Sequence, residues 1–268
     1  MIEHLSYSQY NSYVQCPRSW YLGKVVGAPQ RPAWFLAVGS AVHNAVEFKL
    51  ETGDDPNVAD FFYAEVRKLR LIDPDTEQWL AGGPQADPTV KGKALQLALD
   101  CYEKAGEFLQ DIDVWEVECD ASGRLPGLEV PLKAYVDIIG EHKKHGPTIV
   151  DWKTGANKPK DNFQLETYDA LLRCGMARGF DTYGFTGLWA MLAPKASVAR
   201  PVDLSNVDPA EVGAKYQAVY EQMKNKIYKT NAGFGCNFCF QQDNCLLRSG
   251  PTERARYYDK AEGDGFPF

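Results

Sequence analysis

The chain has 268 residues, of which 44% are hydrophobic, 12% aromatic and 24% charged. This composition supports a sizeable folded core, so it excludes an intrinsically disordered chain and a disulfide-stapled miniprotein. The formal charge of −7, from 29 basic and 36 acidic residues, excludes a simple basic coat for nucleic acid but allows an enzyme that holds nucleic acid locally.

The cysteines and the N-terminal residues indicate the compartment. Seven cysteines form an odd set, and the first residues lack the basic-then-apolar layout of a secretory signal, so we expect a cytoplasmic, reducing location. No stretch approaches about 18 consecutive apolar residues, so no membrane partner is expected. With reduced thiols, a tight cysteine cluster more often binds metal than forms disulfides.

The first part of the chain predicts helices. A short helix is expected within residues 6–21, capped by Ser8 and followed by a turn at Cys16 and the proline after it. A second helix is expected over residues 40–50, where valines at every fourth position face the core and His43 lies on another face.

Residues 54–93 hold an amphipathic run and then the turn-rich stretch GGPQADPT. We expect this region to be a helical insertion or lid. Helical periodicity resumes over residues 93–110.

Strand patterns then take over, and they define the fold class. Strands are expected at residues 114–119, 130–139 and 148–154, a helix at 161–178, strands within 182–192 and 197–204, and a long helix at 208–229. This order predicts an α/β domain with a central mixed β-sheet flanked by helices, and a catalytic core at residues 111–205.

Acidic residues and a lysine meet at one edge of this sheet. Asp151 and Lys153 point to the same face of a strand because one residue separates them, and Asp137 ends the preceding strand. Carboxylate oxygens suit a hard divalent cation such as Mg²⁺, which could polarise a phosphodiester and activate water. Taken alone, such a set is usually no more than ordinary strand-end charges with a salt bridge, so the three residues do not decide the function by themselves.

Four segments change that balance: GSAVHNAVE, AYVDIIG, IVDWKTG and QLETYDALL. Their order and approximate spacing resemble the RecB-like branch of the PD-(D/E)XK nuclease superfamily, over nearly the whole chain. The resemblance implies a restriction-endonuclease-like core that binds Mg²⁺ or Mn²⁺. The site residues it implies are the metal ligands His43, Asp137, Asp151 and the backbone carbonyl of Trp152, the catalytic lysine Lys153, and the Q-x-x-x-Y pair Gln164 and Tyr168.

Each motif has an alternative reading by itself. His43 could be a half-buried histidine with ordinary partners, and Gln164 and Tyr168 could be surface and core side chains of one helix face. The sequence also departs from the motif that gives the superfamily its name. The usual proline-aspartate pair is absent before Asp137, where Tyr135 and Val136 stand instead. RecB-like members often lack that proline.

The C-terminal loop contains Cys236-x-x-Cys239, then five residues and Cys245. Zinc and iron–sulfur clusters commonly take four ligands, so this loop needs one more. The layout resembles the iron–sulfur subset of RecB-like nucleases, which includes AddB and the CRISPR-associated adaptation nucleases. By that resemblance, Cys16 completes a structural [4Fe-4S] site within a single domain of residues 1–268, held by segments 1–30 and 230–250. Zinc in the same thiolates remains open from spacing alone.

The resemblance implies a metal-dependent DNA exonuclease that hydrolyses phosphodiester bonds of single-stranded DNA or duplex ends, in DNA recombination, repair or replication. The alternative is a non-catalytic DNA-binding subunit of a CRISPR spacer-acquisition or recombination complex. Lysines such as Lys158 and Lys160, just after the catalytic strand, could hold phosphate or could form a solvated face.

Overall fold

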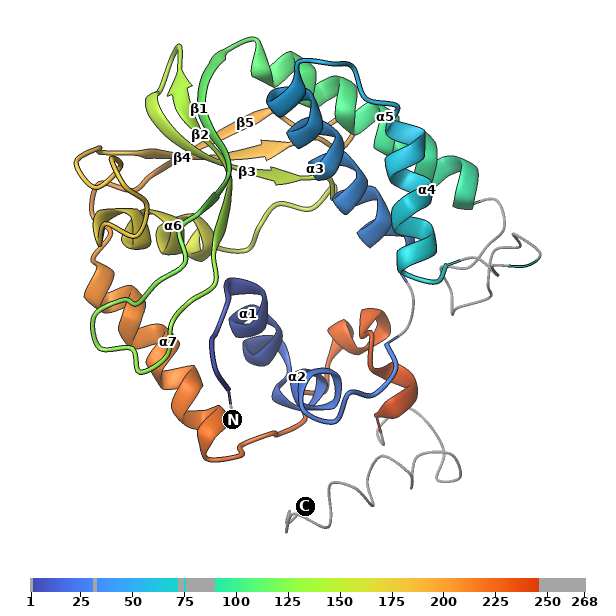
Figure 1. The fold of residues 1–268 in the computed structure, drawn as a ribbon. Coiled ribbons are helices and arrows are strands. Elements are labelled where there is room, and N and C mark those ends of the chain that lie inside the picture. The colour runs from blue at the N-terminus through green and yellow to red at the C-terminus, as the bar shows by residue number, and fades with distance from the viewer. Residues whose placement is uncertain (1, 31–32, 72–74, 76–89, 246–268) are drawn as a thin grey trace. The chain divides into compact units, whose positions relative to one another are not determined.

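A computed structural model describes residues 2–30, 33–71, 75 and 90–245 (Figure 1). The chain divides into two compact units. The terminal unit comprises residues 1–32 and 215–268, and the sheet unit comprises residues 33–214. The last helix, α7, starts in the sheet unit and ends in the terminal unit. In the described ranges, no helix has the length and apolarity needed to cross a membrane.

The sheet unit contains one mixed sheet and its helices. Its elements are α3 (Trp34–Thr52), α4 (Val58–Lys68), α5 (Val90–Leu109), β1 (Ile112–Asp120), β2 (Tyr135–His142), β3 (Gly146–Lys153), α6 (Phe163–Arg173), β4 (Thr186–Met191), β5 (Ala199–Asp203) and the start of α7 (Pro209–Lys224). The five strands lie in sequence order, β1-β2-β3-β4-β5. Among these described strands, β3 and β4 pair in parallel and the other neighbours pair antiparallel, and α6 makes the crossover between β3 and β4. The prediction of an α/β fold with a central mixed sheet is therefore confirmed.

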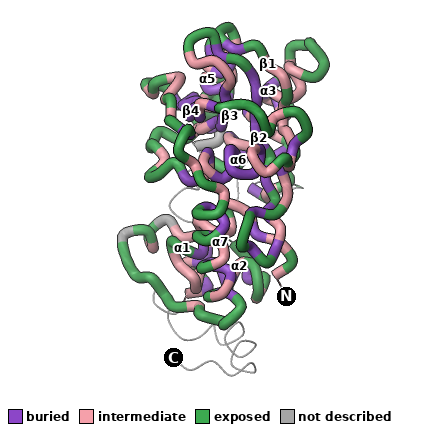
Figure 2. The backbone as a smooth tube through the Cα atoms, turned by 90° about the vertical axis from the view of Figure 1, so that its left-hand side faces the viewer, coloured by how far each residue is buried: buried purple, intermediate pink, exposed green. Residues whose placement is uncertain are grey.

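Helices α3, α4 and α5 build the main hydrophobic core against one face of the sheet (Figure 1), and Figure 2 marks the buried residues along the backbone. Val38, Val42 and Val46 of α3 are buried there, as their spacing predicts. Sheet residues such as Val150 and Trp152 complete this core. Because neighbouring strand residues alternate between faces, the positions between them point the other way.

Helix α6 packs close to the sheet at a glycine of β4. A Cβ atom added at Gly187 would lie 3.0 Å from the Cδ1 atom of Leu165, so a larger side chain there would push α6 outward. Asp151 and Lys153, which alternate with the core residues of β3, contact side chains of α6. This close approach brings the helix within hydrogen-bonding reach of the sheet edge.

Several element boundaries differ from expectation. Ser6 caps α1 (Tyr7–Gln15), rather than Ser8, and a helix, α2 (Pro17–Lys24), replaces the turn predicted at Cys16. Proline fits the first turn of a helix, because backbone N–H groups there have no hydrogen-bond partner within the helix and the absence of one costs nothing. Helix α3 begins six residues earlier than expected, and β2 begins at Tyr135 rather than at residue 130. The stretch GGPQADPT lies outside the described residues; of the expected insertion, α4 is described.

The terminal unit holds α1, α2, the end of α7 and two short 3₁₀ helices, η2 (Phe234–Phe238) and η3 (Gln242–Asn244). Tyr13 and Trp20 are buried in it and meet edge to face, with ring centroids 5.6 Å apart. The two ends of the described chain are joined here by hydrogen bonds. The backbone N–H of Arg18 donates to the carbonyl of Lys229, and the Asn231 amide donates to the carbonyl of Gln15.

Candidate metal and lysine site

A row of side chains crosses the sheet on the face that α6 covers. The antiparallel register of β2 and β3, continued by one position, sets Asp137 opposite Asp151. Asp151 pairs with Trp189 of β4, and Trp189 pairs with Arg200 of β5. Since directly paired residues point to the same side of a sheet, these four side chains form one continuous row.

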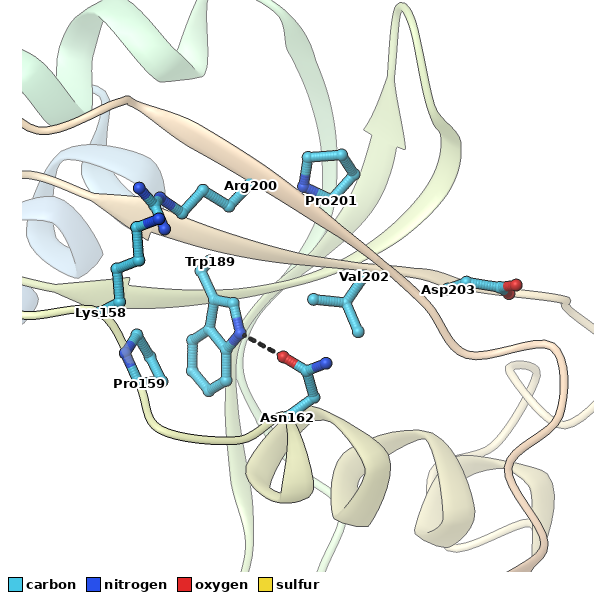
Figure 3. Close-up of a pocket in the computed structure, with 8 residues that line it drawn as sticks. All are labelled: Lys158, Pro159, Asn162, Trp189, Arg200, Pro201, Val202 and Asp203. Atoms are coloured by element: carbon cyan, nitrogen blue, oxygen red, sulfur yellow. Dashed lines mark hydrogen bonds between the residues drawn. The ribbon is translucent and has the colours of Figure 1, made fainter.

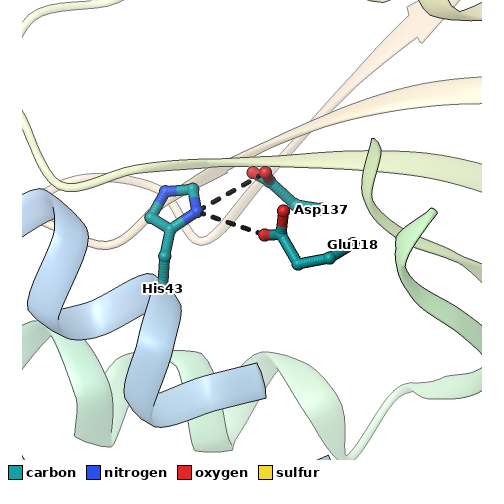
Figure 4. A group of neighbouring side chains, drawn as sticks. All are labelled: His43, Glu118 and Asp137. Carbon is teal, nitrogen blue, oxygen red and sulfur yellow. Dashed lines mark ion pairs between the residues drawn. The ribbon is translucent and has the colours of Figure 1, made fainter. Parts of the chain in front are cut away.

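His43, Glu118 and Asp137 converge at the acidic end of this row (Figure 4). The His43 Nδ1 atom lies 3.4 Å from Asp137 Oδ1 and 3.8 Å from Glu118 Oε1. One ligand atom from each residue lies within 4.8 Å of the others. Among the residues that the structure describes, this is the one group of three potential metal ligands drawn so close together.

Glu118 is the member of this group that the sequence analysis missed. It lies near the end of β1, opposite Asp137 in the continued register of β1 and β2. Its φ of 46° is in the left-handed region, which is uncommon for a residue other than glycine, and the strand carries a bulge between Val114 and Glu116. Bulges and left-handed residues of this kind re-aim side chains at functional sites.

The carboxylates around His43 control its charge. Burial lowers its pKa, but the Asp137 carboxylate, with further contributions from Glu118 and Asp151, raises the pKa to about 10 overall. Without a metal, this imidazole therefore carries a proton at neutral pH. A bound cation would have to displace that proton, because histidine binds metals in its neutral form.

Asp137 and Asp151 are both buried, and each has defined partners. The Oδ2 atom of Asp137 accepts a hydrogen bond of 2.7 Å from the backbone N–H of Trp152, which leaves Oδ1 facing His43. Burial raises the pKa of Asp151, and the ion pair with Lys153 opposes that rise. The lysine ammonium is therefore the main group that keeps this buried carboxyl ionised.

A closed network links Lys153 to helix α6. The Lys153 ammonium pairs with Asp151 and donates to Gln164 Oε1 at 3.0 Å. The Gln164 amide donates to the Tyr168 hydroxyl at 2.8 Å, and that hydroxyl donates to Asp151 Oδ1 at 3.4 Å. Every hydrogen-bond direction in the ring is fixed, because the ammonium can only donate and thus orients the glutamine amide.

The structure therefore brings six of the predicted site side chains to one end of the sheet, but in two groups. His43 and Asp137 lie together with Glu118, where two carboxylates and an imidazole suit a cation such as Mg²⁺ or Mn²⁺. Asp151 lies next to them and contacts Lys153 and Tyr168.

The cysteines predicted to hold a cluster all belong to the terminal unit: Cys16, Cys236, Cys239 and Cys245. Cys16 ends α1 and starts α2, while Cys239 follows η2 and lies 3.4 Å from the Ser19 hydroxyl of α2. Segments near them are tied together, since the Asn244 amide donates to the carbonyl of Pro29. No three of these thiols, all within the described ranges, lie within 4.8 Å of one another.

Comparison with known proteins adds a family and two relatives. The model of the PD-(D/E)XK nuclease superfamily matches residues 4–245. A protein named Gene 69 protein from Mycobacterium phage D29 is 25% identical over 267 residues, covering 90% of this chain and 95% of its own. The Gene 69 protein of Mycobacterium phage L5 is 27% identical over 234 residues, covering 73% of this chain and 78% of its own.

Among solved structures, the chain is similar to one described as the crystal structure of SSO0001. The two share 13% identity with a TM-score of 0.35, over 80% of this chain and 86% of that one. A likeness at this level supports no statement about function.

Proposed function

Because the chain belongs to the PD-(D/E)XK nuclease superfamily, we propose that it is a DNA exonuclease that needs Mg²⁺ or Mn²⁺ and works in DNA recombination, repair or replication. The observation that carries this proposal is the ring of Lys153, Asp151, Gln164 and Tyr168 beside the His43, Glu118 and Asp137 group. A buried carboxylate, a positioned ammonium and a group of side chains that could hold a cation are suited to metal-assisted phosphodiester hydrolysis.

The proposed cation ligands are His43, Glu118 and Asp137, with Asp151 and the carbonyl of Trp152 completing the set. The donor chemistry fits, since oxygen ligands and one imidazole suit Mn²⁺, and carboxylates suit Mg²⁺. When bound, such a cation supplies Lewis-acid polarisation of a phosphate oxygen and a lowered pKa for water.

The chain's own residues have the positioning tasks. Lys153 carries the positive charge that meets the negative charge growing on the phosphate, and Asp151 and Gln164 hold its ammonium in place. Tyr168 fixes the opposite side of Asp151 through its hydroxyl. These residues need little reorganisation during the reaction because each is already hydrogen-bonded.

The proposal includes a [4Fe-4S] cluster with Cys16, Cys236, Cys239 and Cys245 as ligands. Its support is that the four cysteines lie in one compact unit on segments that hydrogen-bond one another. The proposed role is structural. Iron and sulfide analysis of anaerobically purified protein tests the cluster, which should colour the protein brown. A colourless protein that carries zinc would show that the four cysteines bind zinc instead.

A direct nuclease assay tests the proposed activity. Linear single-stranded and duplex DNA, labelled at one end, is incubated anaerobically with the protein and Mg²⁺ or Mn²⁺, beside covalently closed circles. We expect the linear substrates to be shortened from an end and the circles to survive. Asp151→Asn and Lys153→Gln should each lower the rate by about 10²–10³-fold, the usual loss for a group that stabilises transition-state charge.

Matched controls remove the same charges elsewhere. Asp113→Asn changes an exposed carboxylate of β1, and Lys144→Gln changes an exposed lysine in the turn at the far end of β3. Both controls should keep the wild-type rate. If the cluster-containing wild-type protein degrades no DNA with either cation, the proposal is wrong. If it cleaves the closed circles, the protein is an endonuclease rather than an exonuclease.

A further inference from the structure

A pocket of about 440 Å³ lies on the sheet unit beside the lysine network (Figure 3). It is formed by the loop after β3, the start of α6, and strands β4 and β5. The residues that line it are Lys158, Pro159, Asn162, Trp189, Arg200, Pro201, Val202 and Asp203. Nothing in the nuclease chemistry proposed above uses this pocket.

Trp189 connects the pocket to the site. Its indole lines the pocket, while the Lys153 ammonium lies 5.1 Å from the centroid of the same ring. Trp189 also pairs in register with Asp151, so a single side chain separates the pocket from the proposed catalytic groups. The pocket and the Lys153 ammonium therefore share Trp189 as a neighbour.

The pocket concentrates positive charge. Lys158 and Arg200 both line it, and their side chains point toward one another in Figure 3. In the part of the chain that the structure describes, the Arg200 Nε–H is buried and donates no hydrogen bond. A buried donor without an acceptor costs free energy, and an anion bound in the pocket would remove that cost.

Two further lining residues, Asn162 and Asp203, each accept one hydrogen bond through a side-chain oxygen. The Asn162 amide oxygen accepts from Trp189 Nε1 at 3.1 Å, which fixes the indole as a wall. Asp203, the one acidic lining residue, accepts from the backbone N–H of Ser205 at 2.9 Å and points away from Lys158 in Figure 3. The positive charge that an anion would meet in the pocket therefore comes from Lys158 and Arg200.

We propose that this pocket binds a phosphate group of the substrate DNA strand, next to the phosphate that reaches Lys153, through Arg200 and Lys158. The inference rests on the proposed nuclease function and names a substrate contact for it. Guanidinium and ammonium groups are the usual phosphate partners, and the planar guanidinium binds two phosphate oxygens at once. The phosphate comes either from a 5′ end or from within the strand.

Binding without cleavage tests the proposal. Fluorescence anisotropy measures the Kd of single-stranded oligonucleotides labelled at the 3′ end, in EDTA, over a range of salt concentrations. Arg200→Gln and Lys158→Gln should each raise the Kd by about tenfold at low salt and flatten the slope of log Kd against log salt by about 0.7 for the lost phosphate contact. Arg200→Lys should restore most of the slope, because it restores the charge.

Two comparisons identify the source of the phosphate. If the wild-type protein prefers 5′-phosphorylated over 5′-hydroxyl oligonucleotides and Arg200→Gln abolishes that preference, the pocket takes the terminal phosphate. If both oligonucleotides lose affinity equally in the variant, the pocket takes an internal one. Inorganic phosphate should raise the Tm of the wild-type protein but not of Arg200→Gln, which gives a second readout if the variant binds DNA poorly for other reasons.

The matched control is Lys144→Gln, which removes one exposed positive charge outside the pocket. It should leave the Kd and the salt slope unchanged. Wild-type values in Arg200→Gln and Lys158→Gln would overturn the proposal. The failure of the pocket proposal can be told apart from the failure of the nuclease proposal. If the wild-type protein cuts no DNA but Arg200→Gln still weakens its DNA binding, the phosphate pocket is supported and the nuclease function is not.

Discussion

Lys153 donates a hydrogen bond of 3.0 Å to the side-chain oxygen of Gln164, and this bond ties the end of β3 to the first turn of α6. The two residues are eleven positions apart in the sequence. The bond fixes the amide of Gln164, whose nitrogen then meets the Tyr168 hydroxyl. The ammonium is therefore positioned from two sides, by Asp151 and by Gln164.

Removing the glutamine should disturb catalysis more than binding. In Gln164→Ala the ammonium keeps only its ion pair with Asp151 and its contact with the Trp189 ring, so it loses its fixed position. We expect kcat to fall by up to about 10²-fold, the size expected from misplacing a catalytic group, with little change in KM. Tyr168→Phe removes the hydroxyl that bonds Asp151 and the Gln164 amide, but it leaves the bond between Lys153 and Gln164 in place, so it should cost less. Steady-state kinetics on linear DNA separates these effects, and a rise in KM with unchanged kcat would contradict the positioning role.

Glu118 should contribute to cation binding although it is not part of the predicted site. In Glu118→Gln one of the three converging ligands loses its charge, so the Kd for Mn²⁺ should rise at least about tenfold. Titration calorimetry on metal-free protein measures this without any turnover. Glu116→Gln is the matched control, because Glu116 is exposed on the same strand. Equal Mn²⁺ affinity in Glu118→Gln and the control would exclude Glu118 as a ligand.

The sequence predicted the strands and the residues they carry well, because alternation of apolar and polar side chains follows directly from strand geometry. Asp151 and Lys153 share a face for that reason alone. Glu118 could not be predicted as a site residue, because its orientation depends on a left-handed φ and a nearby bulge, and no local sequence pattern indicates either of them. Trp189 and Arg200 could not be predicted as neighbours of the site either, because only the pairing of β4 with β3 and β5 sets them in line with Asp151.

Helix ends were less predictable than helix faces. Ser6 and Ser8 are both good caps, and their hydroxyls lie 3.0 Å apart, so residue type could not choose between them. The early start of α3 at Trp34 has a tertiary cause, since Ala37 and Val38 are buried in the main core. Packing of distant elements, which the sequence alone does not display, decides such boundaries.

The cysteines should separate into two reactivity classes. Burial raises the pKa of Cys101 to about 12, so almost none of it is thiolate at pH 8 and it should resist alkylation in the folded protein. Cys16, Cys236 and Cys239 are more exposed and should react with iodoacetamide once iron is removed, but not in the cluster-containing protein. Mass spectrometry of protein alkylated before and after iron removal measures both classes, and all seven cysteines should label in denaturant. Equal labelling of the proposed ligands in the two samples would argue against a cluster.

Arg173 should stabilise the fold in a way that depends on pH. Its Nε atom lies 2.6 Å from Oδ2 of Asp169, which is fully buried, and burial raises the pKa of Asp169 to about 6 despite this partner. A carboxyl with a raised pKa contributes stability that is complete below its ordinary value near 4 and is lost as pH rises through about 6. In Arg173→Gln the pKa of Asp169 rises further, so the loss continues to higher pH.

Urea unfolding at pH 5 and pH 8 tests this expectation. At pH 5 Asp169 is largely neutral in the folded state, so Arg173→Gln should cost little beyond the hydrogen bond to the carbonyl of Leu204. At pH 8 the variant must either ionise Asp169 without its partner or keep this buried carboxyl protonated, and both cost free energy. We expect the free energy of unfolding to fall by about 2–3 kcal/mol, which is less than for a fully buried pair because Arg173 is partly exposed. Arg178→Gln, in the exposed loop after α6, should cost little at either pH. A gap between wild type and Arg173→Gln that is the same at both pH values would show that Asp169 does not change its protonation in this range.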